Sequence, residues 1–264
     1  MLSTLFKAKP VVDETTREWV FDTFSWCIAH LDGDFFQQNS ELILPNNTFY
    51  PGSASSVEQM AETVFTNTIK YTGMTSWPIK LVSANDFVKK PMPQLFFEST
   101  LRGESCKLTN QEAVPSIEIA FHPSQLNQPQ DLIAYLVQIQ ARILLNQNGM
   151  AAPGGREVLA QTVDLIGCFM GFGVIFANTA YQFKGGCGSC NNRNLNRQAA
   201  LPELETVYAL ALFTVIKGCD IKQIKRELKS HLYKPFRQAH KEITLYLQQT
   251  VNPEHTLLTA NFSQ

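Results

Sequence analysis

Two closely spaced cysteines, Cys187 and Cys190, form the motif in this chain best suited to metal or redox chemistry. A Cys-x-x-Cys pair supplies two thiolate ligands, which is half of a structural zinc site, and the sequence has no second pair at the usual spacing. A redox pair would need the start of a helix in a thioredoxin-like unit, and no such pattern surrounds the motif. Three interpretations stay open: a loop without chemistry, a metal clip completed by distant ligands, and a redox pair.

A single carboxylate, Asp164, lies in an apolar stretch that runs from Val163 to Phe172. A carboxylate buried among apolar side chains needs a counter-charge or hydrogen-bond donors, because its desolvation is otherwise costly. A cationic side chain, a backbone amide or a bound water could supply them. Gly167, Gly171 and Gly173 follow in the same predicted helix and favour close helix packing, since they lack the strand–turn–helix context of a phosphate-binding loop.

The elements that must position these residues predict an α+β fold that is mainly α. Apolar residues at helical spacing predict helices over 13–31, 57–71, 129–147, 155–183, 202–217 and 220–249, the last kinked at Pro235. Short β-branched or aromatic runs predict a small antiparallel sheet of three strands, at 78–83, 94–101 and 116–121. We expect one domain over 1–264, with helices and the sheet in 1–128, a helical core in 129–183, a loop with the cysteine pair in 184–200, and C-terminal helices in 201–264.

Charge balance and apolar runs limit the partners and the location of the chain. Lys and Arg number 22 against 23 Asp and Glu in 264 residues, so no overall positive field attracts nucleic acid or an anionic membrane. The longest apolar run, Leu165–Ala177, is shorter than the roughly 20 residues that span a bilayer and predicts a buried core helix. The start of the chain lacks the apolar core of a signal peptide, and six cysteines are too few for a disulfide scaffold. We therefore expect a cytoplasmic protein.

The last predicted helix carries a basic stripe opposite an apolar row. Its basic residues are Lys222, Lys225, Arg226, Lys229, Lys234, Arg237 and Lys241. This pattern is typical of an amphipathic helix with a solvated outer face. Aromatic residues do not alternate with the basic ones, which argues against a stacking platform for single-stranded nucleic acid.

Six short motifs follow one another along the second half of the chain: Leu132-Ile133-Ala134, Leu144-Leu145, Asp164-Leu165, Gly171-Phe172-Gly173, Ala177-Asn178 and Tyr208-Ala209-Leu210-Ala211-Leu212-Phe213. In these motifs and their order the chain resembles a family of largely uncharacterised bacterial zincin-like proteins, in which a His-Glu-x-x-His helix precedes a series of downstream motifs. The match covers about half of the chain. The resemblance implies a zincin-like helical core behind the small sheet.

The residues that do the family's chemistry are missing at the matching positions. The two zinc-binding histidines correspond to Gln138 and Arg142, the general-base glutamate to Ile139, and the downstream acidic ligand to Gln161. A carboxamide binds zinc weakly, a guanidinium repels it, and an isoleucine cannot activate water. We therefore expect no cofactor and no metal at these positions, and no metallopeptidase activity. Without the downstream motifs, the 131–145 segment is also compatible with a plain amphipathic core helix.

The resemblance implies a catalytically inactive metallopeptidase-like protein that binds or regulates a protein or peptide partner of unknown identity. In the family's helix pairing, Arg142 and Asp164 face each other, which predicts a buried ion pair between them. The alternative is an enzyme of a different, non-zinc chemistry, in which Arg142, Glu157 and Asp164 line a residual cleft. The sequence supplies no nucleophile–base pair for this alternative.

Overall fold

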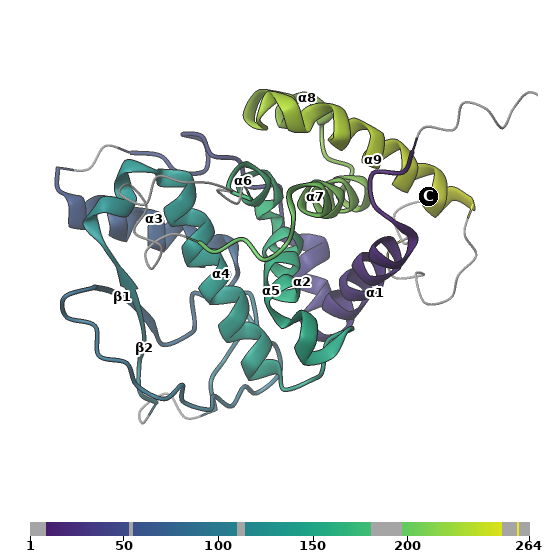
Figure 1. Cartoon of the computed structure of the whole chain (residues 1–264). Coiled ribbons are helices and arrows are strands. Elements are labelled where there is room, and N and C mark those ends of the chain that lie inside the picture. The colour runs from purple at the N-terminus through teal and green to yellow at the C-terminus, as the bar shows by residue number, and fades with distance from the viewer. Residues whose placement is uncertain (1–8, 53–54, 110–113, 181–196, 250–257, 259–264) are drawn as a thin grey trace, which may run out of the picture.

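A computed structural model of the chain describes residues 9–52, 55–109, 114–180, 197–249 and 258, and most of them are helical (Figure 1). The first half contains α1 (Glu14–His30), α2 (Gly33–Gln38), α3 (Val57–Tyr71), β1 (Ile79–Ser83) and β2 (Ile117–Phe121). The second half contains the short turn η2 (Pro123–Asn127), α4 (Pro129–Asn148), η3 (Gly155–Val158), α5 (Leu159–Gly167), η4 (Cys168–Phe172), α6 (Gly173–Asn178), α7 (Glu203–Lys217), α8 (Ile221–Glu227) and α9 (Ser230–Gln249). The mainly helical prediction is confirmed.

Side-chain caps mark the starts of α1 and α3. Asp13 precedes α1 and its carboxylate accepts the backbone N–H of Thr16 at 2.8 Å, while Ser56 precedes α3 and its hydroxyl accepts the N–H of Gln59. Such side chains satisfy the donors that a helix start leaves unpaired. The predicted helices at 13–31 and 57–71 are therefore confirmed almost to the residue.

The sheet has parallel strands, so the antiparallel prediction is wrong. β1 and β2 pair in register from Ile79 with Ile117 to Ser83 with Phe121. Parallel neighbours require a crossover of about a dozen residues or more, and the long segment between the strands provides it. The predicted strand at 94–101 lies in this crossover and contributes one isolated antiparallel bridge, between Phe97 and Leu108.

α7 forms the centre of the core and packs against α9, α6 and η4 (Figure 1). Every residue from Thr206 to Ile216 is buried. A helix that is apolar on all sides must be surrounded by other elements, because no face of it suits water. The buried apolar side chains of the sheet and of the helices form one continuous core around it.

The predicted helix at 155–183 is interrupted, with a π-helical turn, η4, between α5 and α6. Gly171 in this turn has φ 98°, in the left-handed region, and a Cβ there would collide with the carbonyl oxygen of Glu41. The Gly171 carbonyl in turn accepts the N–H of Ile43 at 2.9 Å. Gly167 packs against Phe176, and Gly173 against Leu210, so the predicted use of these glycines in close packing is confirmed.

The stretch Gly155–Asn178 is long and apolar enough to cross a membrane by length and composition alone, and most of it is buried inside the protein. Every residue of its central run, Leu165–Ala177, is buried. The prediction of a buried core segment there is confirmed.

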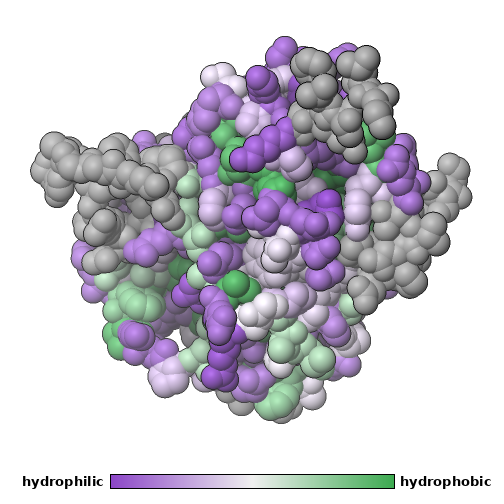
Figure 2. All heavy atoms as spheres, turned by 45° about the vertical axis from the view of Figure 1, so that its right-hand side comes forward, coloured by the Kyte–Doolittle hydropathy of each residue, from purple (hydrophilic) through white to green (hydrophobic). Residues whose placement is uncertain are grey.

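The helix predicted over 220–249 consists of two helices, and the break lies at Leu228 rather than at Pro235. The side chain of Asn178 holds the break: its Nδ2 donates to the carbonyl of Glu227 at 2.8 Å, and its Oδ1 accepts the N–H of Lys229 at 2.9 Å. The seven basic residues of the 220–249 segment are all exposed. The side of the molecule that carries α1 and α9 is largely hydrophilic, with apolar spots between the polar groups (Figure 2).

Candidate functional site

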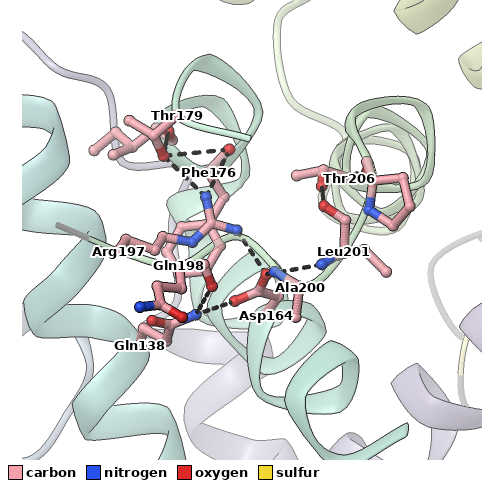
Figure 3. Close-up of polar contacts among 11 residues, drawn as sticks. Gln138, Asp164, Phe176, Thr179, Arg197, Gln198, Ala200, Leu201 and Thr206 are labelled. Carbon is pink, nitrogen blue, oxygen red and sulfur yellow. Dashed lines mark hydrogen bonds and ion pairs between the residues drawn. The ribbon is translucent and has the colours of Figure 1, made fainter. Parts of the chain in front are cut away.

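The four positions that the family resemblance assigns to lost metal-site residues, Gln138, Ile139, Arg142 and Gln161, lie on α4 and α5, which form an antiparallel helical hairpin. Gln138 on α4 donates from Nε2 to Oδ1 of Asp164 on α5 at 2.6 Å, and to the carbonyl of Gln198 at 3.0 Å (Figure 3). Because the two helices run in opposite directions, Arg142, one turn later on α4, lies at the level of Gln161, one turn earlier on α5. The four positions therefore belong to one stretch of the hairpin.

Asp164 is the centre of a closed polar cluster. Its side chain has no exposed surface, and Oδ2 accepts three hydrogen bonds, from Arg197 at 2.8 Å and from the backbone N–H groups of Ala200 at 2.8 Å and Leu201 at 3.0 Å (Figure 3). With Gln138 on Oδ1, both carboxylate oxygens are satisfied. A buried carboxylate that accepts this many hydrogen bonds is held in one orientation.

Arg197 binds main-chain and side-chain oxygens as well as Asp164. Its Nη1 donates to the carbonyl of Phe176 at 3.0 Å and to the hydroxyl of Thr179 at 2.9 Å. The guanidinium carbon lies 4.0 Å from the centre of the Phe176 ring, a cation–π contact. The cluster therefore joins α4, α5, the end of α6 and the segment that leads into α7.

The expected ion pair between Arg142 and Asp164 is not formed, since Asp164 pairs with Arg197 and Arg142 is exposed. The physical reason is the turn of α4: Asp164 lies level with Gln138, and the position one turn later points to solvent. The partner is instead Arg197, which follows Asp164 by 33 residues in the sequence. Arg197 lies outside α4 and α5, so the pairing of these two helices could not indicate it. The prediction that Asp164 needs a counter-charge was correct, and the residue named was wrong.

Substituting Arg142 with alanine should therefore leave the stability almost unchanged. An exposed residue with no ion pair in the described part of the chain contributes little, and such surface substitutions change the free energy of unfolding by less than about 0.5 kcal/mol. Urea unfolding of Arg142→Ala measures this value. A loss above about 2 kcal/mol would instead favour the original pair with Asp164.

The remaining predicted site residues do not assemble a cleft with Asp164. Ile139 and Gln161 are partly buried, and Glu157 is exposed in η3. The fully buried Asp164 cannot be reached from the surface that carries Glu157 and Arg142. In the described part of the chain, Arg142 and Glu157 are exposed and Asp164 is buried, so the structure does not bring these three side chains together.

Metal ligation was predicted only for the cysteine pair, and Cys187 and Cys190 lie outside the described residues. Within the residues that the structure describes, no three His, Cys, Asp or Glu side chains gather as a metal-binding group. Cys27 and Cys168 are described and buried, and burial raises the pKa of both thiols. Neither thiol is therefore a reactive thiolate.

A large open cavity of about 1600 Å³ lies away from the α4–α5 cluster, and the sequence did not indicate it. It is bounded by α2 and the ends of α1, α3 and α4, and by the 94–105 part of the crossover. Carboxamides are frequent in its lining: Gln37, Gln38, Asn39, Gln94, Gln147 and Asn148. The lining also contains hydroxyl groups and the aromatic rings of Phe35, Phe96 and Phe97.

Two charged residues of the lining, Asp32 and Arg102, bond to the backbone that forms the wall of this cavity. Asp32 has a left-handed backbone, φ 59°, and its Oδ2 accepts the N–H groups of Leu101 and Arg102, each at 2.7 Å. Burial raises the pKa of the Asp32 carboxyl, while these two amides oppose the rise. The buried guanidinium of Arg102 donates to the carbonyl of Leu31 and lies over the rings of Phe35 and Phe169. In the sequence, two features point to this wall: the Asp32-Gly33 pair after the first predicted helix, and Arg102 directly before Gly103.

Comparison of the chain with protein-family models, with curated proteins and with solved structures finds no match.

Proposed function

We propose that this chain is a catalytically inactive, metallopeptidase-like protein that works by binding a protein or peptide partner. The observation that carries the proposal is the content of the α4–α5 hairpin. A metallopeptidase needs two imidazoles, a carboxylate base and an open coordination position at this place. Here Gln138 donates hydrogen bonds to Asp164 and Gln198, and the guanidinium of Arg197 supplies the positive charge.

The arrangement of the hairpin supports a lost metal site in particular. An acid that orients a zinc-binding imidazole accepts a hydrogen bond from its second ring nitrogen. Asp164 accepts such a bond from the side chain at 138, the position that matches the first histidine of the resembled family. The permanent cation of Arg197 balances the charge of Asp164, as the charge of a metal ion bound to that histidine would have done.

The cavity is the part of the molecule best suited to bind the partner. A carboxamide offers one acceptor and two donors, which matches the donor and acceptor of a peptide group. Gln147 already bonds to Leu95 and Pro93, but the other carboxamides of the lining, with exposed aromatic surface at Phe96, suit a polypeptide segment that keeps its backbone hydrogen bonds when it leaves water.

Blocking the cavity should remove this binding. Ala29 is exposed and lines the cavity, so Ala29→Trp fills part of it without disturbing the core. Unstructured peptides are selected for binding to the wild-type chain from a displayed library, and their affinities are measured by fluorescence anisotropy. We expect Ala29→Trp to weaken binding by about tenfold or more, the effect of losing about 1.4 kcal/mol.

Ala160→Trp is the matched control, because Ala160 is equally exposed on a helix and lies outside the cavity lining. It should bind the selected peptides like the wild type. Equal affinity of all three proteins would remove the cavity from the proposal, and a selection that yields no binder would count against peptide binding itself.

A further inference from the structure

The outer edge of β1 carries several backbone groups that no other described residue satisfies. The ladder to β2 starts with the N–H of Ile117 on the carbonyl of Pro78 and ends with the N–H of Ala84 on the carbonyl of Phe121, each at 2.7 Å. In a parallel ladder alternate residues of a strand bond to the neighbour, so Lys80 and Val82 face β2. Ile79, Leu81 and Ser83 direct their backbone groups to the other side.

Two of these outward groups are used locally. The N–H of Ile79 donates to Trp77, and the carbonyl of Ser83 accepts from Asp86. Within the described part of the chain, the carbonyl of Ile79, both backbone groups of Leu81 and the N–H of Ser83 have no partner. β1 therefore presents a row of alternating acceptors and donors, which is a template for one more strand.

The two edges of the sheet differ in this respect. On the outer side of β2, the hydroxyl of Tyr135 on α4 donates to the carbonyl of Ala120 at 2.8 Å. That edge is in contact with the helical core. Tyr135 occupies one acceptor of that edge, whereas the β1 edge keeps a longer run of backbone groups without a partner among the described residues.

A groove of about 500 Å³ lies between the second half of β1 and the N-terminal half of α3, and extends past the end of β2 to Phe121 and Pro123. Its lining includes Leu81, Val82 and Ser83 of the strand, and three carboxylates: Glu58, Glu62 and Asp86. All three acids are exposed and none forms an ion pair within the described residues, and no Lys or Arg lines the groove. A segment placed in this groove meets uncompensated negative charge.

We propose that the β1 edge binds an extended segment of a partner protein as a third strand, with Lys or Arg side chains directed toward Glu58, Glu62 and Asp86. Main-chain hydrogen bonds to Leu81 and Ser83 hold the segment, and the carboxylates select a basic one. The groove shares no lining residue with the large cavity, so this inference goes beyond the proposed function and does not depend on it.

The charges also argue against a second copy of this chain as the occupant. Edge-to-edge pairing of two β1 strands would bring the same three carboxylates of both copies together. Like charges across a strand pair are destabilising. A basic segment of another protein has no such conflict.

The test uses a short capped peptide in which Lys and Val alternate, with a Glu–Val peptide of equal length as the charge control. Binding to the full chain is measured by fluorescence anisotropy at low salt, and hydrogen exchange of the Leu81 and Ser83 amides is followed in parallel. We expect saturable binding of the Lys–Val peptide, slower exchange of both amides, and no binding of the Glu–Val peptide.

Two variants locate the contact. Leu81→Pro removes the outward N–H at an edge position that tolerates proline, and Leu81→Ala removes the same packing but keeps the N–H. The proline variant should bind about tenfold more weakly or worse, and the alanine variant within about threefold of wild type, as expected for loss of a strand hydrogen bond. If Leu81→Pro does not fold, the triple variant Glu58→Gln, Glu62→Gln and Asp86→Asn tests the charge term and should bind at least about fivefold more weakly at low salt.

Several results would overturn the proposal. They are the absence of saturable binding, equal binding of the Glu–Val peptide, and undiminished binding by folded Leu81→Pro or by the triple variant. A concentration-dependent dimer that disappears in Leu81→Pro would assign the edge to a second copy instead.

Discussion

Replacing Arg197 with alanine should destabilise the protein by about 3–5 kcal/mol, the range for removing one partner of a buried ion pair. Neither side chain of the pair has exposed surface, so the Asp164 carboxylate would stay buried without its counter-charge. The carbonyl of Phe176 and the hydroxyl of Thr179 would lose their donor as well. Urea unfolding followed by circular dichroism measures the loss.

Asp164→Asn identifies the charge as the cause. It keeps an oxygen acceptor for Ala200 and Leu201 and removes the negative charge. In this background Arg197→Ala should cost about 1–3 kcal/mol less than in the wild type, the coupling energy of residues in contact. Arg142→Ala is the arginine control outside the cluster. A loss below about 1 kcal/mol for Arg197→Ala would mean that solvent reaches Asp164.

The second large effect is the gain of a metal site. The quadruple variant Gln138→His, Ile139→Glu, Arg142→His and Gln161→Glu should bind about one zinc ion per chain with a dissociation constant on the order of 1 μM or tighter. Positions 138 and 142 lie one turn apart on α4, with 161 on the adjacent α5. Asp164 already accepts a hydrogen bond from the side chain at 138 and can orient an imidazole there.

Metal content of the folded variant is measured by elemental analysis after gel filtration. The experiment is carried out in a Cys187→Ser background, which removes zinc held by the cysteine pair. A triple variant that keeps Arg142 is the control, and it should bind no zinc, since a cation stays at a ligand position. If the quadruple variant folds and takes up no zinc, the α4–α5 hairpin is a plain amphipathic core pair. Peptidase activity is a weaker expectation, because small errors in geometry are costly in catalysis.

Elements with local signals could be predicted from the sequence, and those determined by distant contacts could not. α1 and α3 have caps within a few residues, and both predictions held. The break between α8 and α9 depends on Asn178, which is far away in the sequence, whereas Pro235 is a local helix breaker that the helix accommodates. The interruption at Gly171 likewise depends on the backbone of Glu41.

The prediction of an antiparallel sheet failed for a related reason. Short β-branched runs indicate strands, but strand direction depends on the path of the connection. The crossover between β1 and β2 is long enough to return the chain to the end at which β1 starts, so β2 runs in the same direction as β1. The strand-like run of the crossover, 94–101, lines the cavity instead of joining the sheet. Periodicity within one strand carries no information on that path.

The candidate site could likewise be predicted only where a local signal existed. An apolar context predicted that Asp164 needs a partner, and the structure supplies four donors to it. The identity of the cation could not be predicted, because Arg197 lies in a polar stretch outside the helices whose pairing was considered. Residues of the cavity wall, such as Arg102, give no periodic signal at all.

The basic and acidic side chains are unevenly distributed along the chain. Residues 220–249 carry seven basic and three acidic side chains, so with a net charge of −1 the rest of the chain has five more acidic than basic groups. α8 and α9 lie on the opposite side of the molecule from β1 (Figure 1). A cationic segment is therefore repelled where it approaches the exposed basic side chains of residues 220–249, and attracted by the three carboxylates of the groove at β1. Both effects act over about 8 Å at physiological ionic strength, and they change the rate of encounter more than the strength of the final contact.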